Sequence, residues 1–328
     1  MKPRICVTTY VYGDRYQLYI PIAVWSIKKM YPEYDVMIFL HGKLNIELKE
    51  ILIKLDLYEK IKILENVFSD CPNMSPYKAQ ALRWVLWDDS FTSYDYIYFI
   101  DIDMFYIKEP VPLHEQHEFH MKRTGLPFDN MRRIVVVREF SLKRQILRLA
   151  VLIKRHKIKY IVRYFINFRK DIYKLSGLHF VKVKEYYQVF TKNKILYYRN
   201  LIYDGSYVKF GENDEAYLYY IMKDLNFDVD RLAAQNFKNP YEHTDFRNYT
   251  KDLFRPTHGI HMGDYRDGYS MDRIKLILKT PAQQYYKNYI ESVLLEDKEF
   301  VNFLNVLPKY INKYFQRYFQ LSGIMTFK

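Results

Sequence analysis

The feature that most constrains the fold is an alternation of strand-like and helix-like segments over the first hundred residues. Short runs rich in β-branched and aromatic residues predict strands, and the segments between them place apolar residues at helical spacing. The predicted strands are Arg4–Tyr10, Tyr34–Leu40, Lys60–Leu64 and Tyr94–Ile100, and the predicted helices are Tyr16–Met30, Asn45–Leu55 and Pro76–Trp87. This β-α-β-α-β-α-β order predicts an α/β domain with a mostly parallel sheet.

The second half of the chain is less regular. We expect a strand at Gly177–Val183, helices at Glu185–Thr191 and Asn213–Leu225, extended stretches at Arg231–Asn236 and Phe254–His261, and helices from Pro281 onward. Hydrophobic residues make up 49% and charged residues 27% of the 328 residues, which excludes a mainly disordered chain.

Several features bear on location. The longest uncharged run, Tyr16–Ile27, has twelve residues, which is shorter than the roughly 20 that a membrane-spanning helix needs. The N-terminal residues lead directly into a predicted strand without a cleavage-site pattern. Two cysteines, Cys6 and Cys71, cannot form a disulfide framework and indicate a reducing compartment. We therefore expect a cytoplasmic protein.

The net charge of +13, from 51 Lys and Arg against 38 Asp and Glu, indicates an anionic partner. Between Phe140 and Lys170 there are ten basic residues and no acidic one. On a helix, one arc carries the basic side chains and the opposite side carries apolar ones: Arg144, Arg148, Arg155, Lys159 and Arg163 against Leu142, Ile146, Leu149, Ile153, Tyr160 and Tyr164. This pattern is typical of a membrane-surface helix, with a core-packed helix or a groove for an acidic polymer or nucleic acid as alternatives.

The C-terminus repeats the pattern on a shorter scale. Basic residues recur every fourth position beside a row of tyrosines: Lys309, Lys313 and Arg317 with Tyr310, Tyr314 and Tyr318. Tyrosine is favourable at a bilayer interface, so we interpret this as a second basic-aromatic helix at the membrane.

Two carboxylates follow the buried strand that ends at Ile100, namely Asp101 and Asp103. Ligands bind at the carboxyl ends of strands in open α/β sheets, and adjacent carboxylates repel each other unless a cation neutralises them. Hard oxygen ligands suit Mg²⁺ or Mn²⁺, with the phosphates of a nucleotide completing the shell. The alternative is an ordinary strand end with solvated aspartates.

A second polar cluster lies far along the chain, at residues 255–266. It contains two histidines, two glycines and a C-terminal arginine: His258, His261, Gly259, Gly263 and Arg266. Glycine allows a backbone to approach a phosphate, imidazole adds a nitrogen ligand to a metal such as Mn²⁺, and arginine offers a fork for a diphosphate. The alternative is a polar surface turn.

These blocks together resemble a known family. Thr8-Thr9-Tyr10, the helix from Lys78 to Trp84, Asp101-Ile-Asp103, and His261-Met-Gly263 with Arg266 are similar to motifs of GT-A-fold glycosyltransferases. The likeness is greatest to family 8, which includes glycogenin and bacterial lipooligosaccharide galactosyltransferases. It implies an α/β fold of the GT-A (Rossmann-like) type: a mixed, mostly parallel sheet flanked by helices, with a basic helical insertion and a helical C-terminus.

The resemblance also implies roles for individual residues. Asp101, Asp103 and His261 would hold Mn²⁺ (or Mg²⁺), with Asp101 also reaching the ribose. The other donor-binding residues would be Thr8, Thr9 and Tyr10 at uracil and ribose; Lys78 and Arg83 at the sugar or diphosphate; Ser176 and Gly177 at the sugar; and His258, Gly263 and Arg266 at the diphosphate. Asp214 and Glu215, after Asn213, would contact the donor sugar and act in catalysis together with Arg266.

The expected parts are a nucleotide-sugar-binding α/β half at 1–135, the insertion at 136–172, a second half closing the domain at 173–280, and C-terminal helices at 281–328. The implied function is transfer of a sugar from a UDP-sugar to a glycan or lipid-linked acceptor, in surface polysaccharide or lipopolysaccharide synthesis. Retention is favoured; an inverting enzyme would use Asp214 or Glu215 as base.

Two other classes stay open, a basic RNA-binding protein and a metal-dependent nucleotidyltransferase that uses the same aspartates. The charge is concentrated in one amphipathic segment, so we expect no nucleic-acid partner. We expect instead a protein held peripherally at the inner membrane face through 140–170.

Overall fold

The computed structural model describes residues 2–130, 135–137, 172–175, 178–206, 214–234, 258–266 and 271–324. The predicted basic segment at 140–170 lies outside these residues, as do Ser176, Gly177 and Asn213. The strands are β1 (Ile5–Val11), β2 (Asp35–Leu40), β3 (Lys62–Leu64), β4 (Tyr96–Phe99), β5 (Met104–Tyr106), β6 (Phe128–Asn130), β7 (Val135–Val137), β8 (Ile172–Lys174), β9 (His179–Lys182) and β10 (Gly259–His261). The helices are α1 (Asp14–Gln17), α2 (Ile20–Met30), α3 (Ile46–Lys54), α4 (Pro76–Leu82), α5 (Leu113–Thr124), α8 (Val183–Val189), α9 (Lys192–Asp204), α10 (Asp214–Asp224), α11 (Asp230–Ala234), α12 (Met271–Leu278), α13 (Pro281–Tyr289), α14 (Lys298–Val306) and α15 (Lys309–Ser322).

The central sheet has six strands in the order β3-β2-β1-β4-β9-β6. The strands β3, β2, β1 and β4 are parallel to one another, whereas β9 runs antiparallel to both β4 and β6. All seven residues of β1 are buried, as expected for a strand covered on both faces. The predicted mixed, mostly parallel sheet flanked by helices is therefore confirmed.

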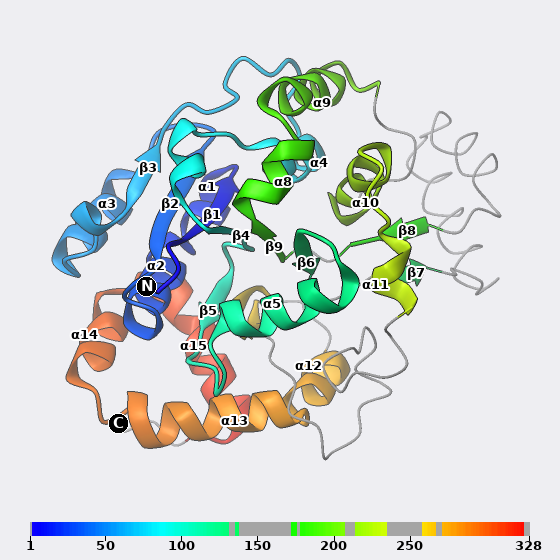
Figure 1. Cartoon of the computed structure of the whole chain (residues 1–328). Helices are drawn as coiled ribbons and strands as arrows, with labels where there is room; N and C mark the ends of the chain where they lie inside the picture. Colours follow the sequence, from blue (N-terminus) through cyan, green and yellow to red (C-terminus); the bar gives the residue numbers. More distant parts are fainter. Residues whose placement is uncertain are drawn as a thin grey trace, which may run out of the picture.

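Helices cover the two faces of this sheet and form two apolar cores. Successive side chains of β1 alternate between the cores, with Ile5 and Val7 in one and Cys6 and Tyr10 in the other. The first core is completed by α2 and the C-terminal helices α13 to α15, and the second by α4, α8, α9 and α10. Figure 1 shows the C-terminal helices, coloured orange to red, on the side of the molecule away from α8 and α9.

Local sequence signals explain where several helices begin. The α3 helix starts after Asn45, whose side chain accepts a hydrogen bond from the backbone N–H of Glu47. The α4 helix starts after Ser75, which caps the N–H of Lys78, and Pro76 occupies its first turn. No helix in these described ranges is long and apolar enough to cross a membrane.

The prediction for Arg231–Asn236 is wrong, because its first residues belong to the helix α11 rather than to an extended stretch. An acidic residue in the first turn and two alanines favour the helix. The predicted helical C-terminus is confirmed, but the apolar stripe of α15 packs into the first core through Ile311, Phe315, Tyr318 and Phe319. Lys309 and Lys313 are exposed.

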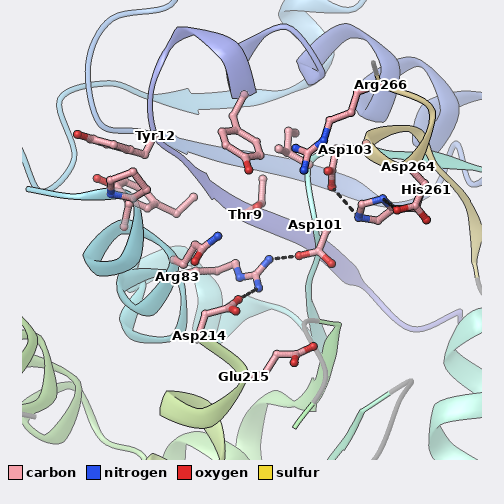
Figure 2. Close-up of a pocket in the computed structure, with 17 residues that line it drawn as sticks. Thr9, Tyr12, Arg83, Asp101, Asp103, Asp214, Glu215, His261, Asp264 and Arg266 are labelled. Carbon is pink, nitrogen blue, oxygen red and sulfur yellow. Dashed lines mark hydrogen bonds and ion pairs between the residues drawn. The ribbon is translucent and has the colours of Figure 1, made fainter. Parts of the chain in front are cut away.

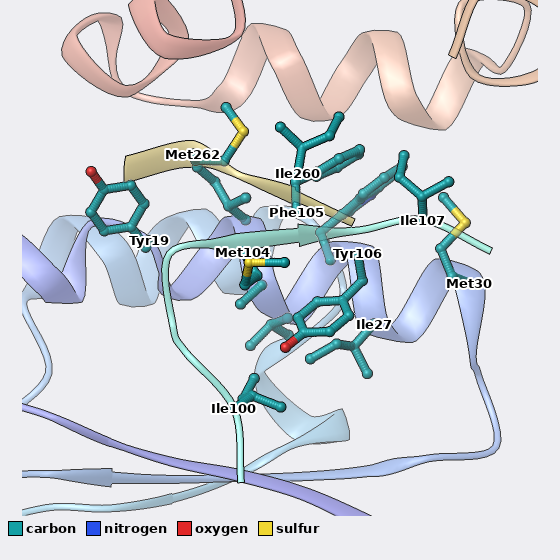
Figure 3. Packing of buried hydrophobic residues seen from close by; sticks show 14 of the residues in the cluster. Tyr19, Ile27, Met30, Ile100, Met104, Phe105, Tyr106, Ile107, Ile260 and Met262 are labelled. Carbon is teal, nitrogen blue, oxygen red and sulfur yellow. The ribbon is translucent and has the colours of Figure 1, made fainter. Parts of the chain in front are cut away.

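A small sheet of β5 and β10 adds a layer that the sequence did not predict. The two strands pair antiparallel, with Met104 opposite His261 and Tyr106 opposite Gly259. Figure 3 shows them side by side next to the C-terminal helices, with the fully buried Phe105 and Ile260 in the packing between them. This pairing joins residues about 155 positions apart in the chain and so brings the two predicted polar clusters together.

The ends of the predicted basic insertion also lie side by side. The strand β7 pairs antiparallel with β8, so that Val135 faces Lys174 and Val137 faces Ile172. The chain therefore leaves and rejoins the described residues at one place, and the segment 138–171 between these strands lies outside them.

Candidate active site

Asp101 and Asp103 lie on the link between two sheets. The strand β4 ends at Phe99, and the backbone N–H of Ile100 bonds to the carbonyl of Thr8 in β1. The chain then passes through the two aspartates and enters β5 at Met104. The carboxylates thus emerge at the carboxyl end of β4, where an open α/β sheet binds its ligands.

The β5–β10 pair places His261 beside Asp103. Nε2 of His261 lies 3.3 Å from Oδ1 of Asp103, and the backbone N–H of Met262 donates to the carbonyl of Asp103 over 2.7 Å. The Asp103 side chain is 16% exposed, and burial raises the pKa of its carboxyl group while His261 opposes the shift. Gly263 packs directly against Asp103, because a Cβ at position 263 would lie 2.4 Å from Oδ2 of Asp103.

Arg83 is the cationic centre of the site. It begins the 3₁₀ turn that follows α4, and only 9% of its side chain is exposed. One guanidinium nitrogen pairs with Asp101 and also donates to the carbonyl of Ile100 at 3.2 Å, and the other lies 2.5 Å from Asp214. A buried guanidinium shared between two carboxylates holds all three groups in register.

Asp214 belongs to the first turn of α10, and its backbone carbonyl accepts a hydrogen bond from the indole N–H of Trp84 at 2.9 Å. The pKa of the Asp214 carboxyl group is raised because the group is buried, although the neighbouring Arg83 opposes the shift. The contact between α10 and α4 places the start of this helix, with Asp214 and Glu215, at the edge of the site.

These groups line one pocket of about 300 Å³. Its lining consists of Thr9, Tyr10, Tyr12, Tyr16, Pro76, Ala79, Gln80, Arg83, Asp101, Ile102, Asp103, Asp214, Glu215, His261, Gly263, Asp264 and Arg266. In Figure 2, Arg83 lies between Asp101 and Asp214, and Asp103 faces His261 on the far side of Asp101. The pocket combines carboxylates, imidazole and two arginines, which suits a ligand that carries phosphates and hydroxyl groups.

The structure brings together most of the residues that the sequence predicts for the site. The pocket lining includes Thr9, Tyr10, Arg83, Asp101, Asp103, Asp214, Glu215, His261, Gly263 and Arg266. The hydroxyl of Thr9 donates to the carbonyl of Ile100 at 2.9 Å, which ties β1 to the aspartate link. The hydroxyl of Tyr10 contacts Nδ1 of His41 at 3.0 Å.

Three of the predicted residues that the structure describes lie outside this lining. Thr8 is buried one residue earlier in β1. Lys78 points away from the pocket, since its amino group donates to the carbonyls of Pro72 at 2.8 Å and Tyr203 at 2.7 Å. Ser176 and Gly177 lie outside the described residues.

His258, the third, lies in a buried polar cluster beneath the site. Its imidazole contacts the hydroxyl of Tyr98, its ring lies 5.1 Å from that of His117, and its backbone N–H donates to Glu109 at 3.0 Å. Burial holds the pKa of His258 well below its usual range, so its ring is neutral. It has a φ of 60°, in the left-handed region, at the entry to β10.

Several pocket residues were missed by the sequence reasoning: Tyr12, Tyr16, Pro76, Ala79, Gln80, Ile102 and Asp264. Gln80 and Asp264 stand within motifs already singled out, so their position in those motifs was a usable signal. Tyr12 and Tyr16 carried no such signal, because the turn after β1 decides where their rings point. The ring of Tyr12 lies 5.0 Å from that of His41.

The donor set fits a hard divalent cation. Asp103 and His261 face each other in the pocket, Asp101 lies two residues away, and Gly263 keeps the space beside Asp103 free of a side chain. Among the described residues, no three acidic, histidine or cysteine side chains are already arranged around one point for a metal ion. Asp101 pairs instead with Arg83.

Comparisons with known proteins give likeness in structure only. No protein-family model matches the sequence, and no curated protein matches it. Solved structures that resemble it include the galactosyltransferase LgtC with donor and acceptor sugar analogues, at 13% identity over 65% of this chain and 69% of that chain, with a TM-score of 0.37. Core-mannan synthase A from Aspergillus fumigatus, in an Mn/GDP form, has 8% identity over 67% and 70% of the two chains and a TM-score of 0.42.

A third similar structure is the bifunctional glycosyltransferase WbbM, at 13% identity over 97% of this chain and 52% of that chain, with a TM-score of 0.41. All three TM-scores are below 0.5.

Proposed function

We propose that this protein is a metal-dependent glycosyltransferase that moves a sugar from a UDP-sugar to a glycan or lipid-linked acceptor. The observation that carries the proposal is the convergence on one pocket of Asp101 and Asp103 with His261 and Arg266. A nucleotide sugar has a diphosphate, which requires cationic partners, and a hexose, which requires carboxylates and hydroxyl groups. The pocket offers both kinds of partner, with Arg83 and Asp214 beside the aspartates.

In this proposal Asp101, Asp103 and His261 hold Mn²⁺ or Mg²⁺. When bound there, the cation would supply Lewis-acid stabilisation of the charge on the departing diphosphate. Arg266, which lines the pocket three residues after Gly263, pairs with the same phosphates. Thr9 and Tyr10, at the end of β1, face the nucleoside.

The transfer itself breaks the bond between the anomeric carbon and the β-phosphate oxygen, and UDP leaves with the electron pair. The acceptor hydroxyl forms the new bond and gives up its proton. Because Asp214 is held by Arg83, we assign it to orienting the donor sugar, and we assign Glu215 to stabilising the positive charge that develops on the sugar. With retention of configuration the proton passes to the departing diphosphate; with inversion, Glu215 or Asp214 accepts it.

The decisive test is a thermal-shift screen of UDP, GDP and CMP with and without Mn²⁺. We expect UDP with Mn²⁺ to raise the melting temperature most, and incubation with UDP-sugars to release UDP. A rise with a nucleoside triphosphate and release of pyrophosphate would instead favour the nucleotidyltransferase alternative. A protein stabilised by none of these nucleotides would contradict the proposal.

We further propose that the protein works peripherally at the inner membrane face, on a lipid-linked or surface-glycan acceptor. Its support is the sequence of 140–170, where five basic residues near an anionic bilayer would each contribute about 1 kcal/mol before screening. Replacing Arg144, Arg148, Arg155 and Lys159 by Glu should abolish binding to anionic liposomes and spare transfer to a small soluble acceptor. Continued sedimentation of that variant with liposomes would contradict the membrane role.

A further inference from the structure

The helix α4 presents one of its faces to the pocket. Its pocket-lining residues, together with the arginine that follows the helix, are spaced by three or four along the chain: Pro76, Ala79, Gln80 and Arg83. Residues at this spacing lie on the same face of a helix. Ala79 and Arg83 are buried, whereas Gln80 is exposed. Gln80 is therefore the residue through which α4 itself offers a long polar side chain to a ligand.

The side-chain amide of Gln80 is not used by the fold. Within the part of the chain that the structure describes, this amide makes no hydrogen bond and no other polar contact. The nearby cations are engaged, since Lys78 donates to two backbone carbonyls and Arg83 pairs with two carboxylates. A pocket-lining amide that the fold does not need is available to orient a bound molecule.

Gln80 lies near the carboxylates that the proposed function assigns to the donor sugar. It precedes Arg83 by three residues, and side chains at that spacing on a helix are neighbours, with Cβ atoms about 5–6 Å apart. The guanidinium of Arg83 lies 2.5 Å from Asp214, at the start of α10, and α10 packs against α4. Glu215, the next residue of α10, lines the same pocket. The amide thus shares this end of the pocket with both carboxylates.

An amide complements these carboxylates chemically. A carboxylate only accepts hydrogen bonds and a guanidinium only donates them, whereas an amide does both. A sugar hydroxyl also donates and accepts, so one amide can pair with two adjacent hydroxyl groups. The pocket lining has five carboxylates against two arginines, of which Arg83 is already paired. This balance disfavours a sugar that carries its own negative charge.

We propose that Gln80 is a specificity-determining residue that hydrogen-bonds hydroxyl groups of a neutral hexose on the nucleotide-sugar donor. This inference rests on the proposed function, since it places the donor sugar in the same pocket. It adds the chemical class of that sugar and a residue that recognises it.

The test compares binding of the nucleotide alone with binding of the whole donor. Calorimetry with Mn²⁺ present measures the Kd of UDP, of the neutral donors UDP-glucose, UDP-galactose and UDP-N-acetylglucosamine, and of the charged donor UDP-glucuronate. We expect the wild type to bind one of the neutral donors most tightly of the four, and that donor is the probe for the variants.

Gln80→Met keeps the length of the side chain and removes its polar atoms. It should bind the probe about 3–10-fold more weakly, the change expected for a lost neutral hydrogen bond, and should bind UDP like the wild type. Gln188→Met, at an exposed glutamine of α8 outside the pocket lining, is the matched control and should alter neither Kd. Thermal melting checks that both variants are folded.

The outcomes separate this inference from the proposed function. If Gln80→Met binds the probe like the wild type, or loses affinity for UDP by the same factor, Gln80 does not recognise the sugar and the inference is overturned, while the proposed function stands. It is also overturned if UDP-glucuronate is bound most tightly, or if the wild type binds UDP but none of the neutral donors. If the wild type binds no uridine nucleotide, the proposed function itself is refuted, together with the inference that rests on it.

Discussion

Gly263 and Asp103 lie so close together that a side chain at position 263 has no room. A Cβ on Gly263 would lie 2.4 Å from Oδ2 of Asp103 and 3.0 Å from the His261 ring. The proposed function requires the Asp103 carboxylate and the His261 ring in fixed positions. At this packing density neither group can move without displacing its neighbours. A single methyl group is therefore a sharp probe of the site.

We expect Gly263→Ala to displace the Asp103 carboxylate and to weaken Mn²⁺-dependent UDP binding at least about tenfold, because Asp103 would no longer be in position to bind the cation. The matched control is Gly42→Ala, because a Cβ there meets nothing within 4 Å. Isothermal calorimetry of the two variants checks the prediction. Equal affinities in Gly263→Ala and Gly42→Ala would show that the close approach has no role in binding.

Arg83 is the shared partner of two carboxylates, Asp101 and Asp214. Arg83→Met leaves Asp101 and Asp214 without their shared cation, and the loss of one partner from a buried ion pair costs about 3–5 kcal/mol. The double variant Arg83→Met with Asp214→Asn should recover part of this loss, because one stranded charge is then removed. Urea unfolding measures both, with the exposed Arg15→Met as control. A double variant no more stable than Arg83→Met contradicts the ion-pair account.

At the scale of elements, the helix α15 braces the turn that carries His261 and Arg266. The guanidinium of Arg317 donates to the carbonyl of Tyr265 at 3.3 Å and to that of Arg266 at 2.6 Å. Tyr318, one residue later, packs its ring edge-on against Tyr265 with centroids 5.0 Å apart. The sequence pattern placed Arg317 in a membrane-facing stripe. In the structure Arg317 instead supports the turn that ends at Arg266.

We expect Arg317→Ala to destabilise the protein by about 1.5–3 kcal/mol, the usual range for hydrogen bonds to a charged donor, and to weaken UDP binding. Arg317→Lys, which can still donate to one carbonyl, should recover part of both. Lys313→Ala, exposed one turn earlier on the same helix, is the control. Urea unfolding together with nucleotide titration distinguishes the two effects; unaltered UDP affinity in a destabilised Arg317→Ala would limit α15 to a structural role.

At the scale of the whole molecule, a buried polar cluster joins β10 to the C-terminal helices. Glu109 is 3% exposed and accepts hydrogen bonds from the Tyr286 hydroxyl of α13 and from the backbone N–H of His258 at 3.0 Å. Burial raises its pKa from 4.5 to about 8. The folded protein therefore keeps this carboxyl group protonated over a range in which the unfolded chain has lost the proton.

The sign of the pH dependence follows from that difference. Between pH 4.5 and about 8 the folded state binds the extra proton, so the contribution of Glu109 to the free energy of unfolding falls as the pH rises. Over that interval the wild type should lose about 3–5 kcal/mol relative to Glu109→Gln, which does not titrate. Urea unfolding at pH 5 and pH 9 measures this, with exposed Glu50→Gln as control. Parallel pH profiles for wild type and Glu109→Gln would refute the assignment.

Much of the architecture could be predicted because local patterns encode it. The β-α alternation of the first hundred residues predicted β1 to β4 and their helices, since burial on both faces demands apolar runs and helix starts demand caps. Most candidate site residues were predicted for a related reason. Asp101, Asp103 and the cluster around His261 belong to short motifs, and the residue types in these motifs indicate metal and phosphate binding.

The membrane-facing role of 140–170 stays a prediction, because that segment lies outside the described ranges. The division of the chain into four parts also stays a prediction. Lys78 and His258 show where sequence reasoning failed. Each has the right chemistry for a phosphate or a metal, but Lys78 is turned to the carbonyl of Tyr203 and His258 to the hydroxyl of Tyr98. Residue type alone does not decide the direction of a side chain.

Local sequence patterns are enough to predict the layered α/β class, the carboxylates at the end of a buried strand and the polar cluster near the C-terminal helices. The packing of the folded chain brings these two clusters into one site, through the antiparallel pairing of β5 with β10. It also decided that Arg83 bridges Asp101 and Asp214 and that Arg317 supports the turn after His261. The physical reason is that contacts between residues far apart in the chain depend on how whole elements pack, whereas propensities and motifs describe only neighbouring residues.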